Sequence, residues 1–65
     1  PDPMFDEVWK AISEAGKVST SYIQRKFALG YNRSAKLMDQ LEHEGVIGPA
    51  LDAKPRLILK PYSST

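Results

Sequence analysis

A chain of 65 residues with no cysteine, one histidine and a formal net charge of +1 has room for one domain and one core, but not for a buried enzyme cleft as well. The lack of cysteine excludes a disulfide framework and a thiolate metal site, and we expect neither a metal nor another cofactor. Because the apolar runs are short and the first ten residues are acidic rather than basic, we expect no membrane span, no signal peptide and a cytoplasmic setting.

The first helix is predicted over residues 2–15. Asp2 is a candidate N-cap, Pro3 suits the first helical position, and Gly16 suits the C-terminal stop. Apolar residues recur along one side at helical spacing, and the charged residues lie on the other side. Trp9 lies inside the apolar arc, so we predict that it packs in the core rather than stacking on nucleic-acid bases.

After a connecting segment at residues 17–18, a second, short helix is predicted to end near Leu29, just before Gly30. Its apolar anchors are Ile23 and Phe27, which are one turn apart. The candidates for its N-cap are the consecutive hydroxyl residues Ser19, Thr20 and Ser21. Because the sequence pairs none of these hydroxyls with a general base, we predict caps or phosphate contacts rather than nucleophiles.

The third helix is predicted to begin near Tyr31 or Asn32 and to end at Gly45, and its two faces differ in chemistry. The face predicted to close the core carries Tyr31, Ser34, Ala35, Leu37, Met38 and Leu41. The opposite face is a polar stripe that carries Asn32, Arg33, Lys36, Asp39, Gln40 and His43. His43 stands near the C-terminal end of the helix dipole, so we predict an exposed residue there rather than a metal ligand.

Two short strands are predicted after the third helix, at residues 46–47 and 56–60, joined by a loop over residues 48–55. The order of three helices followed by a β-hairpin predicts a small, mainly α, α/β domain with the winged helix-turn-helix fold. In that fold the third helix enters the DNA major groove. The loop of the hairpin, called the wing, runs here from Asp52 through Ala53, Lys54 and Pro55 to Arg56 and is predicted to touch the DNA backbone.

Basic residues are concentrated in the middle of the chain. Residues 16–36 hold five lysines and arginines and no acid, whereas residues 1–15 hold four acids and one lysine. This asymmetry is typical of a protein whose basic face meets a polyanion. A solvated basic patch without a partner is the alternative.

The polar stripe carries side chains that match base edges in the major groove. Arginine and lysine match guanine, asparagine and glutamine match adenine, and aspartate accepts from the cytosine amino group. The residues predicted to read bases in double-stranded DNA are Asn32, Arg33, Lys36, Asp39 and Gln40. The residues predicted to contact the DNA backbone are Ser19, Thr20, Ser21, Arg25, Tyr31, Lys54 and Arg56. The alternative is a winged helix that serves protein contacts alone.

The run STSYIQRKFALGYNRSAKLMDQLEHEGVIGP, followed by KPR before the last strand, closely resembles the C-terminal gamma domain of the FtsK/SpoIIIE family of bacterial DNA translocases. The resemblance covers residues 6–59. Its most specific part is Gln24-Arg25-Lys26 leading to Gly30-Tyr31-Asn32-Arg33. It implies that residues 1–65 are one gamma domain from the C-terminus of a longer translocase, which a segment outside these residues anchors at the inner membrane.

The resemblance also implies a function. It implies a domain that reads short, G-rich, asymmetric chromosomal sequences and so directs the hexameric, ATP-driven motor of the same protein during cell division. In the FtsK branch it further implies contact with the tyrosine recombinase XerD and activation of recombination at the dif site. Because the chain contains no GxxxxGK[ST] run, we expect that this piece alone does not hydrolyse nucleotides. We also expect the isolated domain to be a monomer.

The base-reading positions of the family map onto Asn32, Lys36 and Asp39. The enterobacterial pattern has arginine at the position of Lys36 and glutamate at the position of Asp39. Lysine keeps the positive charge but lacks the bidentate fork that arginine places on guanine. The resemblance therefore implies the mode of reading and leaves the exact recognition sequence and the branch of the family open.

Overall fold

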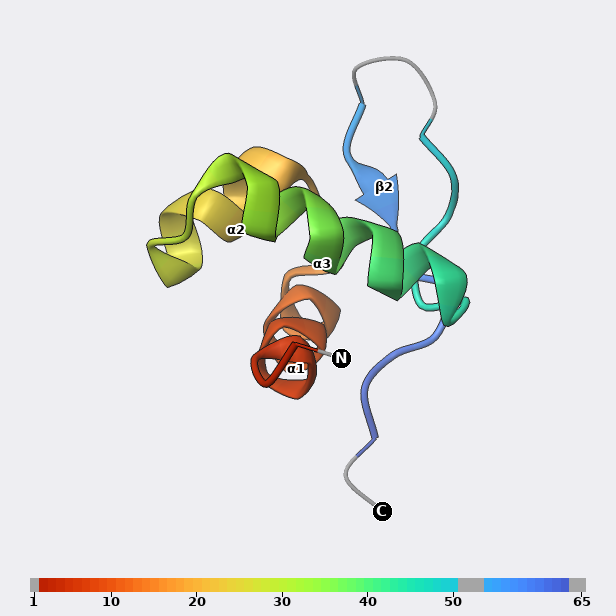
Figure 1. Cartoon of the computed structure of the whole chain (residues 1–65). Helices are drawn as coiled ribbons and strands as arrows, with labels where there is room; N and C mark the ends of the chain where they lie inside the picture. Colours follow the sequence, from red (N-terminus) through yellow and green to blue (C-terminus); the bar gives the residue numbers. More distant parts are fainter. Residues whose placement is uncertain (1, 51–53, 64–65) are drawn as a thin grey trace.

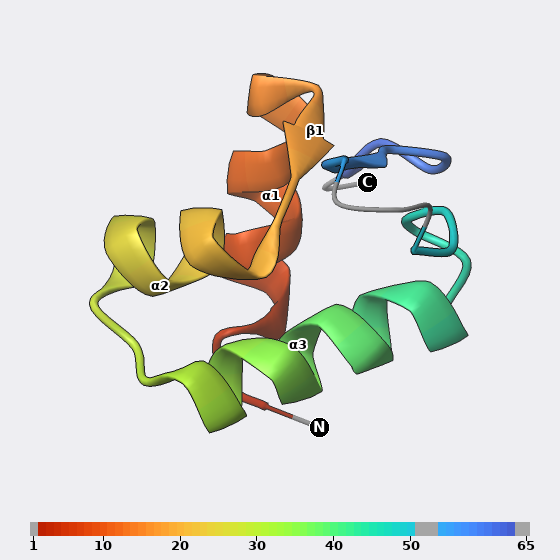
Figure 2. The same ribbon diagram turned by 90° about the horizontal axis from the view of Figure 1, so that it is seen from above.

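The computed structural model describes residues 2–50 and 54–63, and its helices are α1 (Phe5–Ala15), α2 (Thr20–Phe27) and α3 (Tyr31–His43). In Figure 1, α3 crosses α1, and α2 lies beside the N-terminal half of α3. Figure 2 shows the same arrangement from above. With the strands β1 (Lys17–Val18) and β2 (Arg56–Leu57), these helices form a small, mainly helical winged-helix domain, which confirms the predicted fold class.

The two-stranded antiparallel sheet joins the segment after α1 to the C-terminal strand. Lys17 lies opposite Leu57, and Val18 lies opposite Arg56. The prediction of residues 17–18 as a plain connection was therefore wrong. A strand of two residues shows no alternation in the sequence that could reveal it. Its pairing depends on partners 38 and 40 residues away that only the folded chain brings close.

The predicted hairpin pairing of residues 46–47 with residues 56–60 is present in a reduced form. Ile47 and Ile58 form a single antiparallel bridge, and the Leu59 N–H donates to the Val46 carbonyl at 2.7 Å. Residues 46–47 are thus not a regular strand, and the second predicted strand is shortened to residues 56–57. The Val46 carbonyl also accepts from the Lys60 N–H at 3.2 Å, so two successive donors share one acceptor and the regular ladder does not continue. Asp52 and Ala53 of the predicted wing lie outside the described residues.

The first turn of the chain precedes α1 instead of belonging to it. Asp2 was predicted as the cap of a helix over residues 2–15, but α1 begins at Phe5. The Asp2 Oδ1 atom accepts from the Met4 N–H at 2.8 Å, and the Asp2 carbonyl accepts from the Phe5 N–H at 2.9 Å. Asp2 therefore caps this turn. The predicted stop at Gly16 is confirmed, since its N–H donates to the Ile12 carbonyl at 2.8 Å.

Helix α2 is capped by the first of the three hydroxyl residues that were predicted as candidates for its N-cap. The Ser19 Oγ accepts from the Tyr22 N–H at 3.1 Å, so Ser19 is the N-cap among the three hydroxyl candidates. The helix ends at Phe27, slightly earlier than predicted, because Ala28 adopts the left-handed conformation with a φ of 55°.

Helix α3 ends where the sequence predicted, in the turn at Gly45. Gly45 has a φ of 76°, and its N–H donates to the Glu42 carbonyl at 3.0 Å. The Val46 N–H donates to the Leu41 carbonyl at 2.9 Å. This pair of bonds is a Schellman motif, which needs a left-handed residue at the position of the glycine.

The core lies between the three helices and the sheet. Among the described residues, its buried apolar side chains are Val8, Ile12, Val18, Ile23, Leu37, Met38, Leu41, Val46 and Ile47. The predicted core face of α3 is confirmed at Ser34, Leu37, Met38 and Leu41, and Ala35 is half-buried. Tyr31 is 64% exposed, so its predicted place on the core face of α3 was wrong. Tyr31 is the first residue of α3, and its side chain lies beyond the part of the core against which the later turns of the helix pack.

Trp9 packs against the core as predicted, and it also holds the C-terminal segment. Its Nε1–H donates to the Lys60 carbonyl at 2.8 Å, and its ring meets the Tyr62 ring edge to face with centroids 5.1 Å apart. The Tyr62 N–H donates to the Ser13 Oγ at 2.8 Å. These contacts anchor the chain that follows β2 to α1.

Candidate nucleic-acid interface

Three of the predicted base-reading side chains form an exposed line along α3, which we call the reading line: Asn32, Lys36 and Asp39. Their spacing of four and three residues places them above one another on a helix. The opposite face of α3 is buried in the core, so the reading line faces outward. Within residues 2–50 and 54–63, none of the three side chains has a hydrogen bond or ion pair, which leaves their polar atoms available to a ligand.

Arg33 lies on the edge of the stripe that faces the start of the chain, and it is occupied. Its Nε donates to Asp2 Oδ2 and its Nη2 donates to Asp2 Oδ1, both at 2.9 Å. The hydrogen bond from Arg33, with a second from the Met4 N–H, lowers the pKa of Asp2 from 3.8 to about 2. The same bond raises the pKa of the Arg33 guanidinium. Arg33 is thus held by an intramolecular partner rather than lying free beside the reading line.

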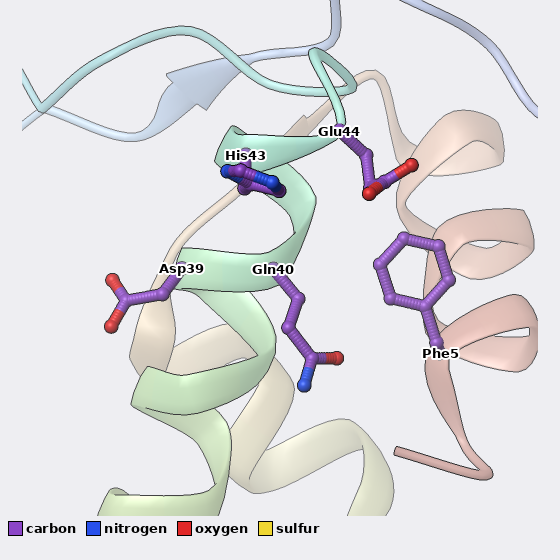
Figure 3. Close-up of a pocket in the computed structure, with 5 residues that line it drawn as sticks. All are labelled: Phe5, Asp39, Gln40, His43 and Glu44. Carbon is purple, nitrogen blue, oxygen red and sulfur yellow. The ribbon is translucent and has the colours of Figure 1, made fainter. Parts of the chain in front are cut away.

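Gln40 also leans toward α1, about one quarter of a helical turn from the reading line by its spacing. Figure 3 shows its side chain on the side of α3 that faces Phe5, while Asp39 points away from α1. An open groove of about 630 Å³ lies here, lined by Phe5, Asp39, Gln40, His43 and Glu44. The Gln40 Oε1 atom is buried and has no hydrogen-bond partner among the described residues. The five predicted base-reading residues are therefore divided into three that face outward and two that face α1.

The predicted backbone contacts on α2 differ in their surroundings. Ser19 already accepts the capping hydrogen bond, and its Oγ is 3.5 Å from the Ser21 Oγ. Thr20 is half-buried, whereas Ser21 and Arg25 are exposed. Helix α2 thus offers an exposed hydroxyl at its start and an exposed guanidinium near its end.

The remaining predicted backbone contacts are Tyr31, at the start of α3, and Lys54 and Arg56, on the wing. Tyr31 and Lys54 are exposed. The Arg56 Nη1 donates to Glu42 Oε1 of α3 in an ion pair, so Arg56 links β2 to α3. Lys54 therefore remains as the exposed wing cation within the described part of the wing, and Arg56 is engaged.

Sequence reasoning missed the two carboxylates that bind these arginines, Asp2 and Glu42. Asp2 is 31 residues from Arg33, and Glu42 is 14 residues from Arg56. Neither separation matches a helical or strand repeat, so no local pattern could have paired them. The available signal was the contrast between the acidic residues 1–15 and the basic middle of the chain. This contrast does not say which acid pairs with which arginine.

The described residues contain no group of three or more histidine, cysteine, aspartate or glutamate side chains that could hold a metal ion. No helix in this part of the chain has the length and the apolar character needed to cross a bilayer.

The family model described as the Ftsk gamma domain matches residues 1–61. The chain belongs to the FtsK gamma domain family. The resemblance inferred from Gln24-Arg25-Lys26 and Gly30-Tyr31-Asn32-Arg33 is thereby confirmed.

The curated relatives of this FtsK gamma domain carry the name DNA translocase FtsK. The proteins from Treponema pallidum and from Streptococcus pyogenes serotype M1 are 46% and 49% identical to it, each over 59 residues, or 91% of the chain. The protein from Staphylococcus epidermidis is 50% identical over 58 residues, or 89% of the chain. The matched region spans about 7% of the length of each of these relatives.

Proposed function

We propose that this FtsK gamma domain binds double-stranded DNA sequence-specifically, with α3 in the major groove, and so orients translocation by the protein of which it is a part. The observation that supports the proposal is the reading line, three exposed polar side chains on the outward face of α3 that have no hydrogen bond or ion pair among the described residues. An exposed helix fits the width of the major groove, and the core behind α3 holds it rigidly enough to present the line.

The chemistry of the reading line suits a G-rich site. Lys36 supplies a cation for the guanine O6 and N7 acceptors, and Asp39 supplies an acceptor for the amino group of the cytosine opposite. Asn32 can bind adenine through its amide, or the backbone at the groove edge. Arg33 and Gln40 are proposed as additional base contacts on the side of the line nearest α1. Arg33 can offer its bidentate fork to a base only after it leaves Asp2.

The proposed backbone contacts surround the reading line. Ser21, Arg25 and Tyr31 are exposed on α2 and at the start of α3, and Lys54 is exposed on the wing. Ser19 and Arg56 are proposed contacts that already hold a hydrogen bond or an ion pair within the domain, and Thr20 is a proposed contact whose side chain is half-buried. Few phosphates can be reached by a domain of this size, so affinity for DNA is modest unless several copies act together. Copies carried by a hexamer of the longer translocase would supply that avidity.

Selection from a pool of duplexes with a randomised central segment tests sequence reading without assuming the target. The proposal predicts enrichment of a short, asymmetric, G-rich sequence, which we call the selected duplex. No enrichment together with binding to the starting pool would contradict sequence reading. No binding at low salt would instead favour a module for protein contacts alone.

We also propose that the domain contacts a XerD-type tyrosine recombinase and activates it at dif. Membership of the FtsK gamma domain family supports this part of the proposal. The test is the rate of XerD-dependent strand exchange at dif with and without the domain, added free or fused to the recombinase. Stimulation is the expected result. The same rate in all three reactions would confine the domain to DNA reading.

A further inference from the structure

The Asp2–Arg33 pair joins the turn before α1 to the first turn of α3. The two bonds are parallel and equal in length at 2.9 Å, and each uses a different carboxylate oxygen and a different guanidinium nitrogen. This bidentate arrangement is the most directional form of ion pair between protein side chains. It therefore fixes the direction of the Arg33 guanidinium as well as its charge.

The carboxylate is itself held in place by the backbone. Asp2 Oδ1 accepts the Met4 N–H at 2.8 Å, and the Asp2 carbonyl accepts the Phe5 N–H at 2.9 Å. The Asp2 side chain is 14% exposed, while the Arg33 side chain is 45% exposed. The anion is thus the fixed partner of the pair, and the cation is the partner that solvent or DNA can reach.

Resting on the proposed function, we propose that Asp2 is a specificity-determining residue: it neutralises Arg33 at the edge of the reading line and so keeps Arg33 out of sequence-independent binding. A duplex phosphate attracts a free guanidinium, but it attracts only weakly a guanidinium whose charge is already neutralised by a carboxylate. Arg33 contacts DNA only where a matching base edge offers a bidentate partner in place of Asp2.

The salt dependence of binding measures this effect directly. Each phosphate that a cation neutralises adds about 0.9 to the slope of log affinity against log salt concentration. Replacing Asp2 by asparagine keeps an acceptor for the Met4 N–H and removes the charge that holds Arg33. The Asp2→Asn variant should therefore show a slope on a scrambled duplex that is steeper by about 0.9 than that of the wild type. This corresponds to about threefold more loss of affinity between roughly 50 and 200 mM salt.

The matched control is Asp6→Asn. Asp6 is exposed on α1 and has no ion pair within the described residues, so the substitution makes the same change in net charge without touching Arg33. The proposal predicts that Asp6→Asn leaves the slope unchanged. It also predicts that the ratio of affinities for the selected and scrambled duplexes falls in Asp2→Asn and not in Asp6→Asn, and that Asp2→Glu retains the wild-type slope.

A second pair of variants assigns the effect to Arg33. In the Arg33→Ala background, Asp2→Asn should no longer steepen the slope, because the cation that it releases is absent. Equal slopes for Asp2→Asn and Asp6→Asn, or a steepening that persists in the Arg33→Ala background, would overturn the proposal. If the wild type itself binds the selected and scrambled duplexes equally, the proposed function fails instead. Retention of helical circular dichroism in each variant shows that the comparison concerns folded domains.

Discussion

Replacing Lys36 by alanine should remove one base contact from the reading line without disturbing the fold. Lys36 is exposed, has no ion pair within the described residues and lies in the middle of α3, where alanine is a good helix former. Loss of a base contact in the major groove costs about 1–3 kcal/mol on the matched site, or roughly 5- to 150-fold in affinity. On a scrambled duplex the same substitution removes at most one phosphate contact, so the loss there is smaller.

Titration of the selected and scrambled duplexes with wild type, Lys36→Ala and Lys10→Ala measures this difference. Lys10 is an exposed lysine on α1 and serves as the control for net charge. In Lys36→Ala, the ratio of affinities for the selected and scrambled duplexes should fall almost as much as the affinity for the selected duplex itself. In Lys10→Ala, this ratio should stay constant. Lys54→Ala, on the wing, should weaken both duplexes alike. Parallel losses on both duplexes in Lys36→Ala would refute the assignment of Lys36 to base reading.

Three further predictions concern stability, each measured by urea unfolding. Because the pKa of Asp2 is lowered to about 2, the stabilisation by its pair with Arg33 is complete above about pH 4 and is lost as pH falls toward 2. Asp2→Asn should lower the free energy of unfolding by less than about 1 kcal/mol at pH 6. A difference in this free energy from wild type that stays constant down to pH 2 would contradict the prediction. Gly45→Ala should destabilise by about 1 kcal/mol because of the φ of 76°, and an unchanged midpoint would argue against the left-handed turn. Ser34→Ala should stabilise by up to about 1 kcal/mol, because the Ser34 Oγ is buried and has no partner among the described residues; a clear loss of stability would show that this hydroxyl is bonded.

The helices and the core were predictable from the sequence because both depend on local patterns. The 3.6-residue period identified the buried face of α3, and glycine marked the end of α3 at Gly45. Errors occurred where the local signal was short or the residue stood at an element's end. Strand β1 has only two residues, and Tyr31 satisfies the helical period but lies beyond the core at the first turn of α3.

The residues of the polar stripe of α3 were predictable from the sequence. Which of them face outward and which face the N-terminal part of the chain was not predictable. Angular position alone places Arg33 and Gln40 beside the reading line. The position of the N-terminal turn and of Phe5 decides that both side chains lean toward α1, and this is a tertiary relation. Ion pairs between residues far apart in sequence follow from the packing of helices, so the occupied state of Arg33 could be found only in the folded structure.

The affinity ratio of the wild-type domain for the selected and scrambled duplexes, measured at two salt concentrations, tests the central claim most directly. If the reading line contacts bases, the ratio should exceed about tenfold, because even two base contacts contribute roughly 2 kcal/mol or more. The ratio should also persist at the higher salt concentration, since phosphate contacts weaken with salt on both duplexes alike. Equal affinities at both salt concentrations would contradict sequence reading by α3.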